Sequence, residues 1–344
     1  GYLDKYNTNG QKIWSVELGI GGVNVIQPTT DGNYIIGRAG TGSGYGYLDK
    51  YNTNGQKIWS VELGIGGVNV IQPTTDGNYI IGRAGTGSGY GYLDKYNTNG
   101  QKIWSVELGI GGVNVIQPTT DGNYIIGKAG TGSGYGYLDK YNTNGQKIWS
   151  VELGIGGVNA IQPTTDGNYI IGKAGTGSGY GYLDKYNTNG QKIWSVELGI
   201  GGVNVIQPTT DGNYIIGRAG TGSGYGYLDK YNTNGQKIWS VELGIGGVNA
   251  IQPTTDGNYI IGRAGTGSGY GYLDKYNTNG QKIWSVELGI GGVNVIQPTT
   301  DGNYIIGRAG TGSGYGYLDK YNTNGQKIWS VELGIGGVNT IIFP

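Results

Sequence analysis

Charged side chains recur at fixed positions in this chain and are the first candidates for chemistry. The first 45 residues carry six of them: Asp4, Lys5, Lys12, Glu17, Asp31 and Arg38. Two carboxyl groups at a suitable separation can supply the acid and the base of glycoside hydrolysis. An acid and a base need different environments, however, and a repeated sequence gives every copy the same environment. We therefore expect ion pairs and solvated charges rather than an enzyme, and we assign no catalytic residue.

The composition removes other kinds of chemistry. The chain has no Cys and no His, so it lacks thiol nucleophiles, thiolate ligands and the commonest general base and metal ligand. We expect no metal and no cofactor. Lys plus Arg and Asp plus Glu both number 23, and this balance argues against nucleic acid as a partner. No apolar run approaches the roughly 20 residues that cross a bilayer, so we also expect no membrane insertion.

Two short polar runs, each followed by a glycine, are candidate ligand sites. Both recur along the chain, and the first copies contain Thr29, Thr30, Asp31, Asn7, Thr8 and Asn9. Their hydroxyl, amide and carboxylate groups can hydrogen-bond sugars as in lectins, or coordinate calcium if several oxygens converge. The alternative is ordinary turn chemistry, because tight turns select Asn, Asp and hydroxyl residues.

Aromatic residues offer a second way to hold a sugar. The tryptophans share one position of the sequence pattern: Trp14, Trp59, Trp104, Trp149, Trp194, Trp239, Trp284 and Trp329. They could stack on sugar rings, but a position in the middle of a strand favours packing between neighbouring repeats.

A glycine-rich run, GTGSG at residues 40–44, superficially resembles a phosphate-cradling loop. Such loops need a helix N-terminus behind them. No helical periodicity follows this run, so we interpret it as a link between strands.

All these residues belong to one 45-residue unit. The unit first runs from Gly1 to Tyr45, fills residues 1–315 with seven copies, and is followed by a partial copy over residues 316–344. A period of about 40 to 50 residues is typical of a four-stranded propeller blade. We therefore predict an all-β fold: a single β-propeller domain over residues 1–344, with one antiparallel blade per repeat.

The strands are predicted at residues 23–29, 33–39, 45–51 and 56–63. Asp-Gly and Asn-Gly turns supply the positive φ that hairpins need, and the first and third turns bring the polar runs to one face of the domain. The strands do not alternate cleanly between apolar and polar residues, as expected when stacked blades cover both faces of each sheet. A sandwich does not readily explain equivalent copies. A β-solenoid is the alternative fold, disfavoured because its coils are usually shorter.

Residues 48–59 (LDKYNTNGQKIW), together with the run DGNYIIG, resemble the repeats of secreted bacterial and archaeal propellers in the broader PQQ-like superfamily. The resemblance covers essentially the whole chain. It implies a propeller in which the Trp docks each blade on its neighbour, and an extracellular or cell-surface location. Quinoprotein enzymes of that superfamily hold their cofactor and calcium with singular residues. This chain has none, and its spacing between Asp and Gly before the Trp is two residues longer than in the enzyme motif.

The two ends of the chain break the pattern. The sequence opens with the third strand of a repeat and closes after the first strand, one strand short of eight blades. We predict that the tail pairs into the blade begun by residues 2–18 and closes a ring of eight through Val338, Asn339, Thr340, Ile341, Ile342 and Phe343. The tail also resembles a second strand, and the sequence does not decide between the two. Alternatively, seven blades close alone and leave the first hairpin free to pair with another molecule.

Near-identical copies favour binding over catalysis. The differences between copies are mild: Arg38 becomes Lys128 and Lys173, and Val25 becomes Ala160 and Ala250. The predicted function is non-catalytic, multivalent recognition of surface glycans, because linked sites make weak affinities useful. The alternative is a scaffold or filament subunit that associates with other copies of itself through open strand ends.

Overall fold

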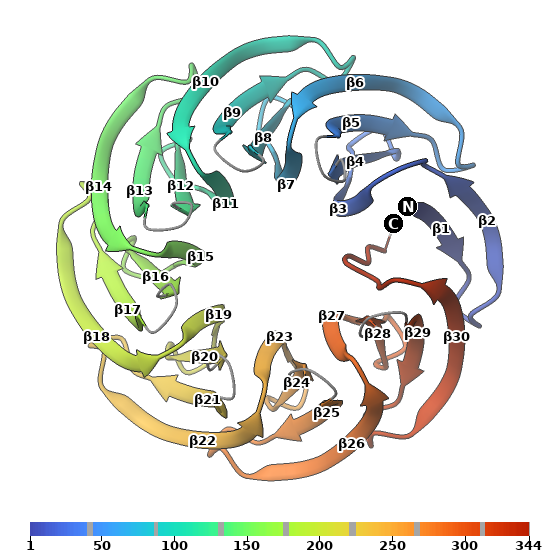
Figure 1. Cartoon of the computed structure of the whole chain (residues 1–344). Coiled ribbons are helices and arrows are strands. Elements are labelled where there is room, and N and C mark those ends of the chain that lie inside the picture. Colours follow the sequence, from blue (N-terminus) through green and yellow to red (C-terminus); the bar gives the residue numbers. More distant parts are fainter. Residues whose placement is uncertain are drawn as a thin grey trace. The chain divides into compact units, whose positions relative to one another are not determined.

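The computed structural model describes residues 1–39, 44–85, 89–129, 134–174, 179–219, 225–264, 269–309 and 314–343. Residues 40–43 of the glycine-rich link lie outside these ranges. The described chain is built from β-strands joined by turns (Figure 1), and no helix in it is long and apolar enough to cross a membrane. It opens with a hairpin of β1 (Tyr2–Tyr6) and β2 (Lys12–Glu17), which pair only with each other.

After this hairpin a sequence of four strands recurs seven times, and each group of four is called a blade below. The first strands are β3 (Gly22–Pro28), β7 (Gly67–Pro73), β11 (Gly112–Pro118), β15 (Gly157–Pro163), β19 (Gly202–Pro208), β23 (Gly247–Pro253) and β27 (Gly292–Pro298). The second strands are β4 (Tyr34–Ala39), β8 (Tyr79–Ala84), β12 (Tyr124–Ala129), β16 (Tyr169–Ala174), β20 (Tyr214–Ala219), β24 (Tyr259–Ala264) and β28 (Tyr304–Ala309). The third strands are β5 (Tyr45–Tyr51), β9 (Tyr90–Tyr96), β13 (Tyr135–Tyr141), β17 (Tyr180–Tyr186), β21 (Tyr225–Tyr231), β25 (Tyr270–Tyr276) and β29 (Tyr315–Tyr321). The fourth strands are β6 (Lys57–Ile65), β10 (Lys102–Ile110), β14 (Lys147–Ile155), β18 (Lys192–Ile200), β22 (Lys237–Ile245), β26 (Lys282–Ile290) and β30 (Lys327–Ile335).

The predicted repeat of antiparallel strands is confirmed. In the first blade β4 pairs with β3 and β5, and β5 pairs with β6. Gly32 and Gly55 close the predicted turns with φ of 78° and 79°, a region that glycine enters without a steric cost. The fourth strand runs two residues beyond the predicted Leu63, to Ile65, because a register shift between Tyr45 and Tyr47 lets the pairing continue.

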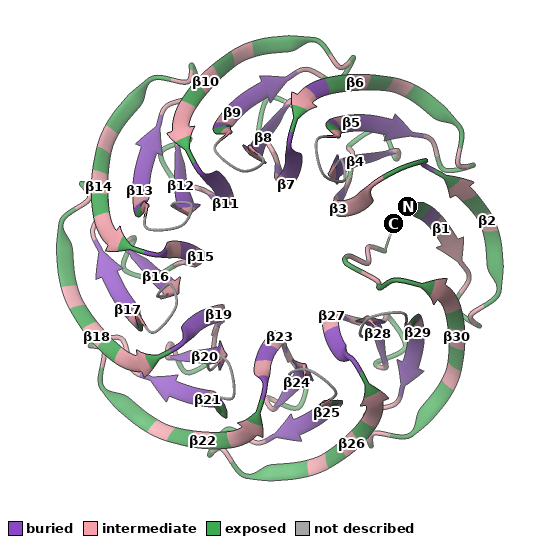
Figure 2. Ribbon diagram, viewed as in Figure 1, coloured by how far each residue is buried: buried purple, intermediate pink, exposed green. Residues whose placement is uncertain are grey.

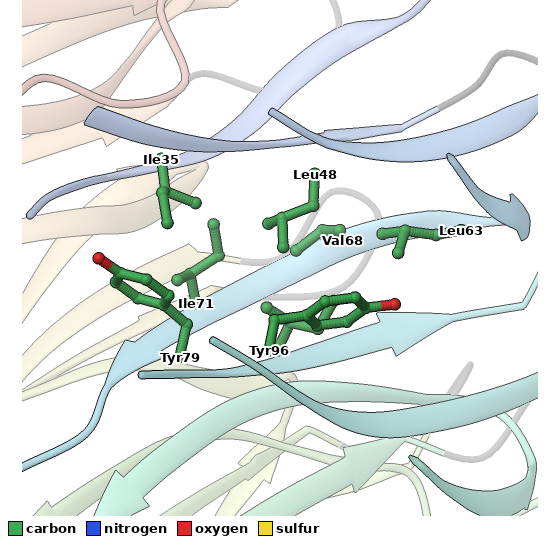
Figure 3. Packing of buried hydrophobic residues seen from close by; sticks show 8 residues of the cluster. Ile35, Leu48, Leu63, Val68, Ile71, Tyr79 and Tyr96 are labelled. Atoms are coloured by element: carbon green, nitrogen blue, oxygen red, sulfur yellow. The ribbon is translucent and has the colours of Figure 1, made fainter. Parts of the chain in front are cut away.

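Each blade has two apolar faces, which explains why its strands do not alternate in hydrophobicity. Figure 3 shows one contact between neighbouring blades, where Ile35 and Leu48 meet Ile71 and Tyr79. Ile36 points to the other face and packs in a cluster with the first hairpin. Second and third strands are therefore buried on both sides, whereas β6 is mostly exposed or half-buried (Figure 2). Each fully buried aliphatic side chain contributes roughly 1.5–3 kcal/mol, so stability resides between blades as much as within them.

The chain forms two compact units, each with this architecture. One unit contains residues 1–169, 187–191 and 342–344, and the other contains residues 170–186 and 192–341. Within the first unit the blades β3–β6 and β7–β10 share the cluster shown in Figure 3. Within the second unit the blades β23–β26 and β27–β30 share an equivalent cluster.

A buried ion pair links two strands within a blade and reaches the chain that comes before the blade. The Arg38 guanidinium donates through Nε to Asp49 at 2.7 Å and through Nη1 to the Leu18 carbonyl at 2.7 Å. Ser60 donates to the other oxygen of Asp49, whose side chain is fully buried. The guanidinium also lies 4.4 Å from the centre of the Tyr47 ring. One Arg thus joins two strands of its own blade to the chain before them.

The chain itself contains a natural variation of this pair. Lys128 replaces the Arg opposite Asp139, at 3.3 Å, and donates a hydrogen bond to the Leu108 carbonyl at 3.1 Å. One buried oxygen of Asp139 has no hydrogen-bond partner there, and the same is true of Asp184 in the copy that carries Lys173. The compact ammonium does not reproduce the two-pronged geometry of the guanidinium.

The C-terminal segment departs from the prediction. Residues 338–343 were expected to form a strand, but they form none. Gly337 makes an isolated bridge to Ala309, and the Val338 amide donates to the Arg308 carbonyl at 3.3 Å. First strands of complete blades make the same bridge to the second strand of the preceding blade, as Gly292 does to Ala264. Among the described residues the tail has no second strand of its own beside it, and its pairing stops at this bridge. Ile342 instead packs on the cluster that contains Leu3 and Leu18 of the first hairpin.

We predict that the substitutions Lys128→Arg and Lys173→Arg stabilise the protein by about 1 kcal/mol each, because each restores a hydrogen bond to a buried carboxylate. Arg218→Lys and Arg263→Lys should destabilise it by a similar amount. Urea unfolding midpoints measure these changes. The exposed Lys237→Arg is the control, with an expected effect within about 0.5 kcal/mol. If Lys128→Arg and the control Lys237→Arg changed stability equally, the missing hydrogen bond to the buried carboxylate could not be the cause.

Candidate binding site

The turn residues proposed as ligand groups are engaged within the protein. The Thr29 hydroxyl donates to one oxygen of Asp31, and the Lys50 ammonium donates to the other oxygen at 2.7 Å. Partial burial alone would raise the pKa of Asp31, but the hydrogen bonds from Lys50, Thr29 and Asn33 hold it well below its ordinary value. Thr30 is exposed. Most of the polar groups in this turn therefore stabilise the turn.

The second polar turn is also internally bonded. The side-chain oxygen of Asn7 accepts from the backbone amides of Asn9 and Gln11 at 3.0 and 2.9 Å, and its amide donates to the Gln11 side chain at 2.8 Å. The copies that begin at Asn52 and Asn97 repeat this arrangement. Asn9 and Thr8 are exposed. This is the Asx chemistry that shapes tight turns.

Trp59 and Lys50 of one blade both contact the Asn-containing turn of the next blade. Trp59 donates its indole N–H to the Thr98 carbonyl at 3.1 Å, in the turn of the next blade. The Lys50 ammonium, which holds Asp31, approaches the same carbonyl at 3.4 Å. A Cβ placed on Gly100 would lie 2.9 Å from the Trp59 ring, so this turn needs glycine where the indole covers it. The corresponding bonds of Trp104 and Trp284 are both 3.1 Å.

Sequence reasoning missed a pair of exposed apolar side chains in each blade. Tyr45 lies opposite Ile65 at the end of the β5–β6 hairpin, and these side chains are 49% and 54% exposed. We call each such couple a Tyr–Ile pair. The other pairs are Tyr90 with Ile110, Tyr135 with Ile155, Tyr180 with Ile200, Tyr225 with Ile245, Tyr270 with Ile290, and Tyr315 with Ile335. The chain therefore presents the same aromatic and aliphatic couple seven times.

Glycines flank both members of each pair. Tyr45 stands between Gly44 and Gly46, and Ile65 stands between Gly64 and Gly66. A Cβ on Gly46 would collide with the Gly66 carbonyl, and a Cβ on Gly66 would collide with Ala84 of the next blade. The runs Gly-Tyr-Gly and Gly-Ile-Gly were the sequence signals for this surface.

A polar group stands beside each pair. Tyr47, two residues after Tyr45 on the same face of the sheet, donates its hydroxyl to Glu62 at 3.1 Å. That hydrogen bond raises the pKa of Tyr47. Glu62 is exposed and keeps acceptor capacity. The exposed tyrosine and isoleucine side chains can pack against an apolar part of a ligand. The carboxylate beside them can accept hydrogen bonds from hydroxyl groups of the same ligand.

Among the residues that the structure describes, no three or more Asp and Glu residues gather in a group that could hold a metal ion.

No family model matches the sequence, and no curated protein matches it. Among solved structures, the chain is similar to the propeller of Dos1, with a TM-score of 0.64, 11% identity, and coverage of 88% of this chain and 78% of that one. It is also similar to the WD40 β-propeller domain of Doa1, with a TM-score of 0.54, 11% identity, and coverage of 84% and 90%. A protein from Lactobacillus plantarum matches with a TM-score of 0.57, 14% identity, and coverage of 86% and 94%. At this identity the likeness establishes a β-propeller fold and nothing about activity.

The ionised turn carboxylates predict how stability depends on pH. Because the pKa of Asp211 is lowered on folding, its contribution is complete above the unfolded value near 4 and is lost as the pH falls toward the folded value. Asp211→Asn should lower the free energy of unfolding at pH 7. The loss should be less than about 1 kcal/mol, because the side chain is half exposed.

The loss caused by the same substitution should be smaller at pH 2 than at pH 7, because at pH 2 the carboxyl group is protonated in the unfolded chain, whereas at pH 7 it is ionised in both states. Thermal unfolding from pH 2 to pH 7 tests this, with the exposed neighbour Thr210→Ala as a control. A loss that is the same at every pH would contradict the ion-pair explanation.

Proposed function

We propose that the chain is a non-catalytic binding propeller that recognises a repeating glycan through its seven Tyr–Ile pairs. The supporting observation is the exposure of the same aromatic and aliphatic couple in every blade, with a carboxylate beside it. A tyrosine ring can stack on the apolar face of a sugar, and Glu62 and its equivalents can accept hydrogen bonds from sugar hydroxyls. Linked sites raise the effective concentration of the next site, so individually weak contacts become useful.

The proposal moves the ligand surface away from the polar turns. The Thr29 and Asp31 side chains are bonded to each other and to Lys50, so a sugar would have to break those bonds before forming its own. The Tyr45 and Ile65 side chains offer exposed area, and covering it removes apolar surface from water.

We further propose that the first hairpin and the C-terminal segment share an eighth blade, and that the chain is related to PQQ-like propellers. Ile342 packs beside Leu3 and Leu18, and this supports the shared blade. In the interface between the blades β3–β6 and β7–β10, side chains of the first and second strands occupy the corresponding position. The indole bond from Trp59 to the next blade supports the relationship. Seven self-sufficient blades with a free hairpin are the alternative arrangement.

A second candidate function is self-association into a scaffold. It is favoured by the edge of β1, which has no strand partner in the part of the chain that the structure describes. Light scattering across a dilution series separates the candidates. A constant mass near 36.2 kDa supports single-chain binding, whereas growth with concentration supports a scaffold.

We predict that replacing the tyrosines of all the pairs by Ala lowers apparent affinity for a polymeric glycan by about 100-fold or more, because avidity is lost with the sites. Replacing only Tyr45 should have a small effect. An array of α- and β-linked oligosaccharides identifies the probe, and calorimetry on the best binder gives affinity and sites per chain.

A matched control uses the equally exposed isoleucines that lack a tyrosine partner. These residues, at 49–50% exposure, are Ile58, Ile103, Ile148, Ile193, Ile238, Ile283 and Ile328. Replacing them by Ser should leave binding unchanged. Glycan binding that survives loss of the tyrosines, or no binding by any glycan on the array, would overturn the proposal.

A further inference from the structure

We infer that the open edge of β1 is a peptide-binding site that accepts an extended strand with an aromatic–Ile–Ile–Gly–Arg pattern from a partner molecule. This site is separate from the Tyr–Ile pairs, so its test is independent of the proposed function. The inference rests on three comparisons between the first hairpin and complete blades: strand pairing, charge and apolar cover.

The first comparison concerns strand pairing. In a complete blade the third strand pairs on both edges, and Tyr51, Asp49 and Tyr47 of β5 lie opposite Tyr34, Ile36 and Arg38 of β4. In the first hairpin β1 pairs only with β2. An exposed strand edge offers backbone donors and acceptors in a row, which is the basis of peptide binding by strand addition.

The second comparison concerns charge. Asp49 is fully buried and holds Arg38, whereas its equivalent Asp4 is 19% exposed and lies 3.5 Å from the surface ammonium of Lys12. No Arg approaches Asp4 in any described contact. A strand that places an Arg where Arg38 lies in its blade would give Asp4 the guanidinium partner that Asp49, Asp94, Asp229, Asp274 and Asp319 have.

A neighbouring cation completes the pattern. Lys50 binds Asp31, which belongs to the turn before the second strand of its own blade. The equivalent Lys5 donates to the Thr53 carbonyl at 3.3 Å and has no carboxylate among its described contacts. A ligand that carries the turn as well as the strand therefore offers an Asp carboxylate to Lys5 and an Arg guanidinium to Asp4.

The third comparison concerns apolar cover. Val68 and its equivalents in later blades are fully buried, but Val23, which faces the first hairpin, is only half-buried. The intact interface next to it includes Ile35 of a second strand, and at the first hairpin only Ile342 from the C-terminal segment takes part. The first Ile of an incoming strand, which corresponds to Ile35, would add cover over Val23.

The test uses a synthetic peptide with the sequence of residues 28–39, PTTDGNYIIGRA, labelled with a fluorophore and titrated with the whole chain. Fluorescence anisotropy should show saturable binding of one peptide per chain. A scrambled peptide of the same composition should not bind. Replacing the peptide's Arg by Ala should weaken binding about tenfold or more, because it removes a hydrogen bond to a charged group.

Protein variants locate the site. Asp4→Asn should weaken binding of the parent peptide by a similar factor. It should have little effect on binding of the peptide in which Arg is replaced by Ala, because that peptide already lacks the contact with Asp4. Glu17→Gln, which removes an exposed carboxylate of β2, is the control. If Asp4→Asn perturbs folding, the peptide variants still test the contact on the unaltered protein.

Several results would overturn the inference. These are absence of binding up to millimolar peptide, equal binding of the scrambled peptide, several peptides per chain, or identical losses for both peptides in Asp4→Asn. Loss of glycan binding would leave this inference unaffected, and failure of the peptide would leave the Tyr–Ile pairs unaffected.

Discussion

The buried pair of Arg38 and Asp49 is the interaction on which the repeat depends. It lies between the second and third strands of a blade and extends to the carbonyl of Leu18, the residue that follows β2. A charge buried this completely must be paired, because removing one partner typically costs 3–5 kcal/mol. The Arg of a blade therefore needs a backbone carbonyl from the part of the chain before that blade. The second apolar face of the blade is covered by the blade that follows.

This dependence decides which surfaces remain for function. Side chains between blades are used for packing, and the polar turns are used to hold the Trp59 indole and the Lys50 ammonium against the next blade. What remains is the glycine-flanked end of the third and fourth strands, where Tyr45 and Ile65 have no cover. At the first hairpin the same dependence has a different result, because Asp4 lacks the buried Arg or Lys that pairs with its equivalent in each blade.

The sequence predicted the repeat, the strand order and the hairpin turns because these depend on local chemistry. Glycine at 32 and 55 and the 45-residue period suffice for them. It did not predict that Asp31 is bonded to Lys50, because that contact joins residues 19 positions apart. It also did not predict the exposure of Tyr45, which depends on how the strands are arranged in the folded blade. The tail was expected to form a strand because its residues resemble those of complete blades. Its pairing depends on a neighbouring strand, which sequence similarity alone does not provide.

The central claim is that each blade docks on the next through its tryptophan and not through a bound ligand. Hydrogen exchange of the indole N–H groups, followed by nuclear magnetic resonance on the ligand-free protein, tests this most directly. The account predicts slow exchange for the tryptophans from Trp14 to Trp284, because each of these indole N–H groups is bonded to a backbone carbonyl of the next turn. Exchange at the rate of free tryptophan would contradict it and would return these side chains to the role of ligand-stacking residues.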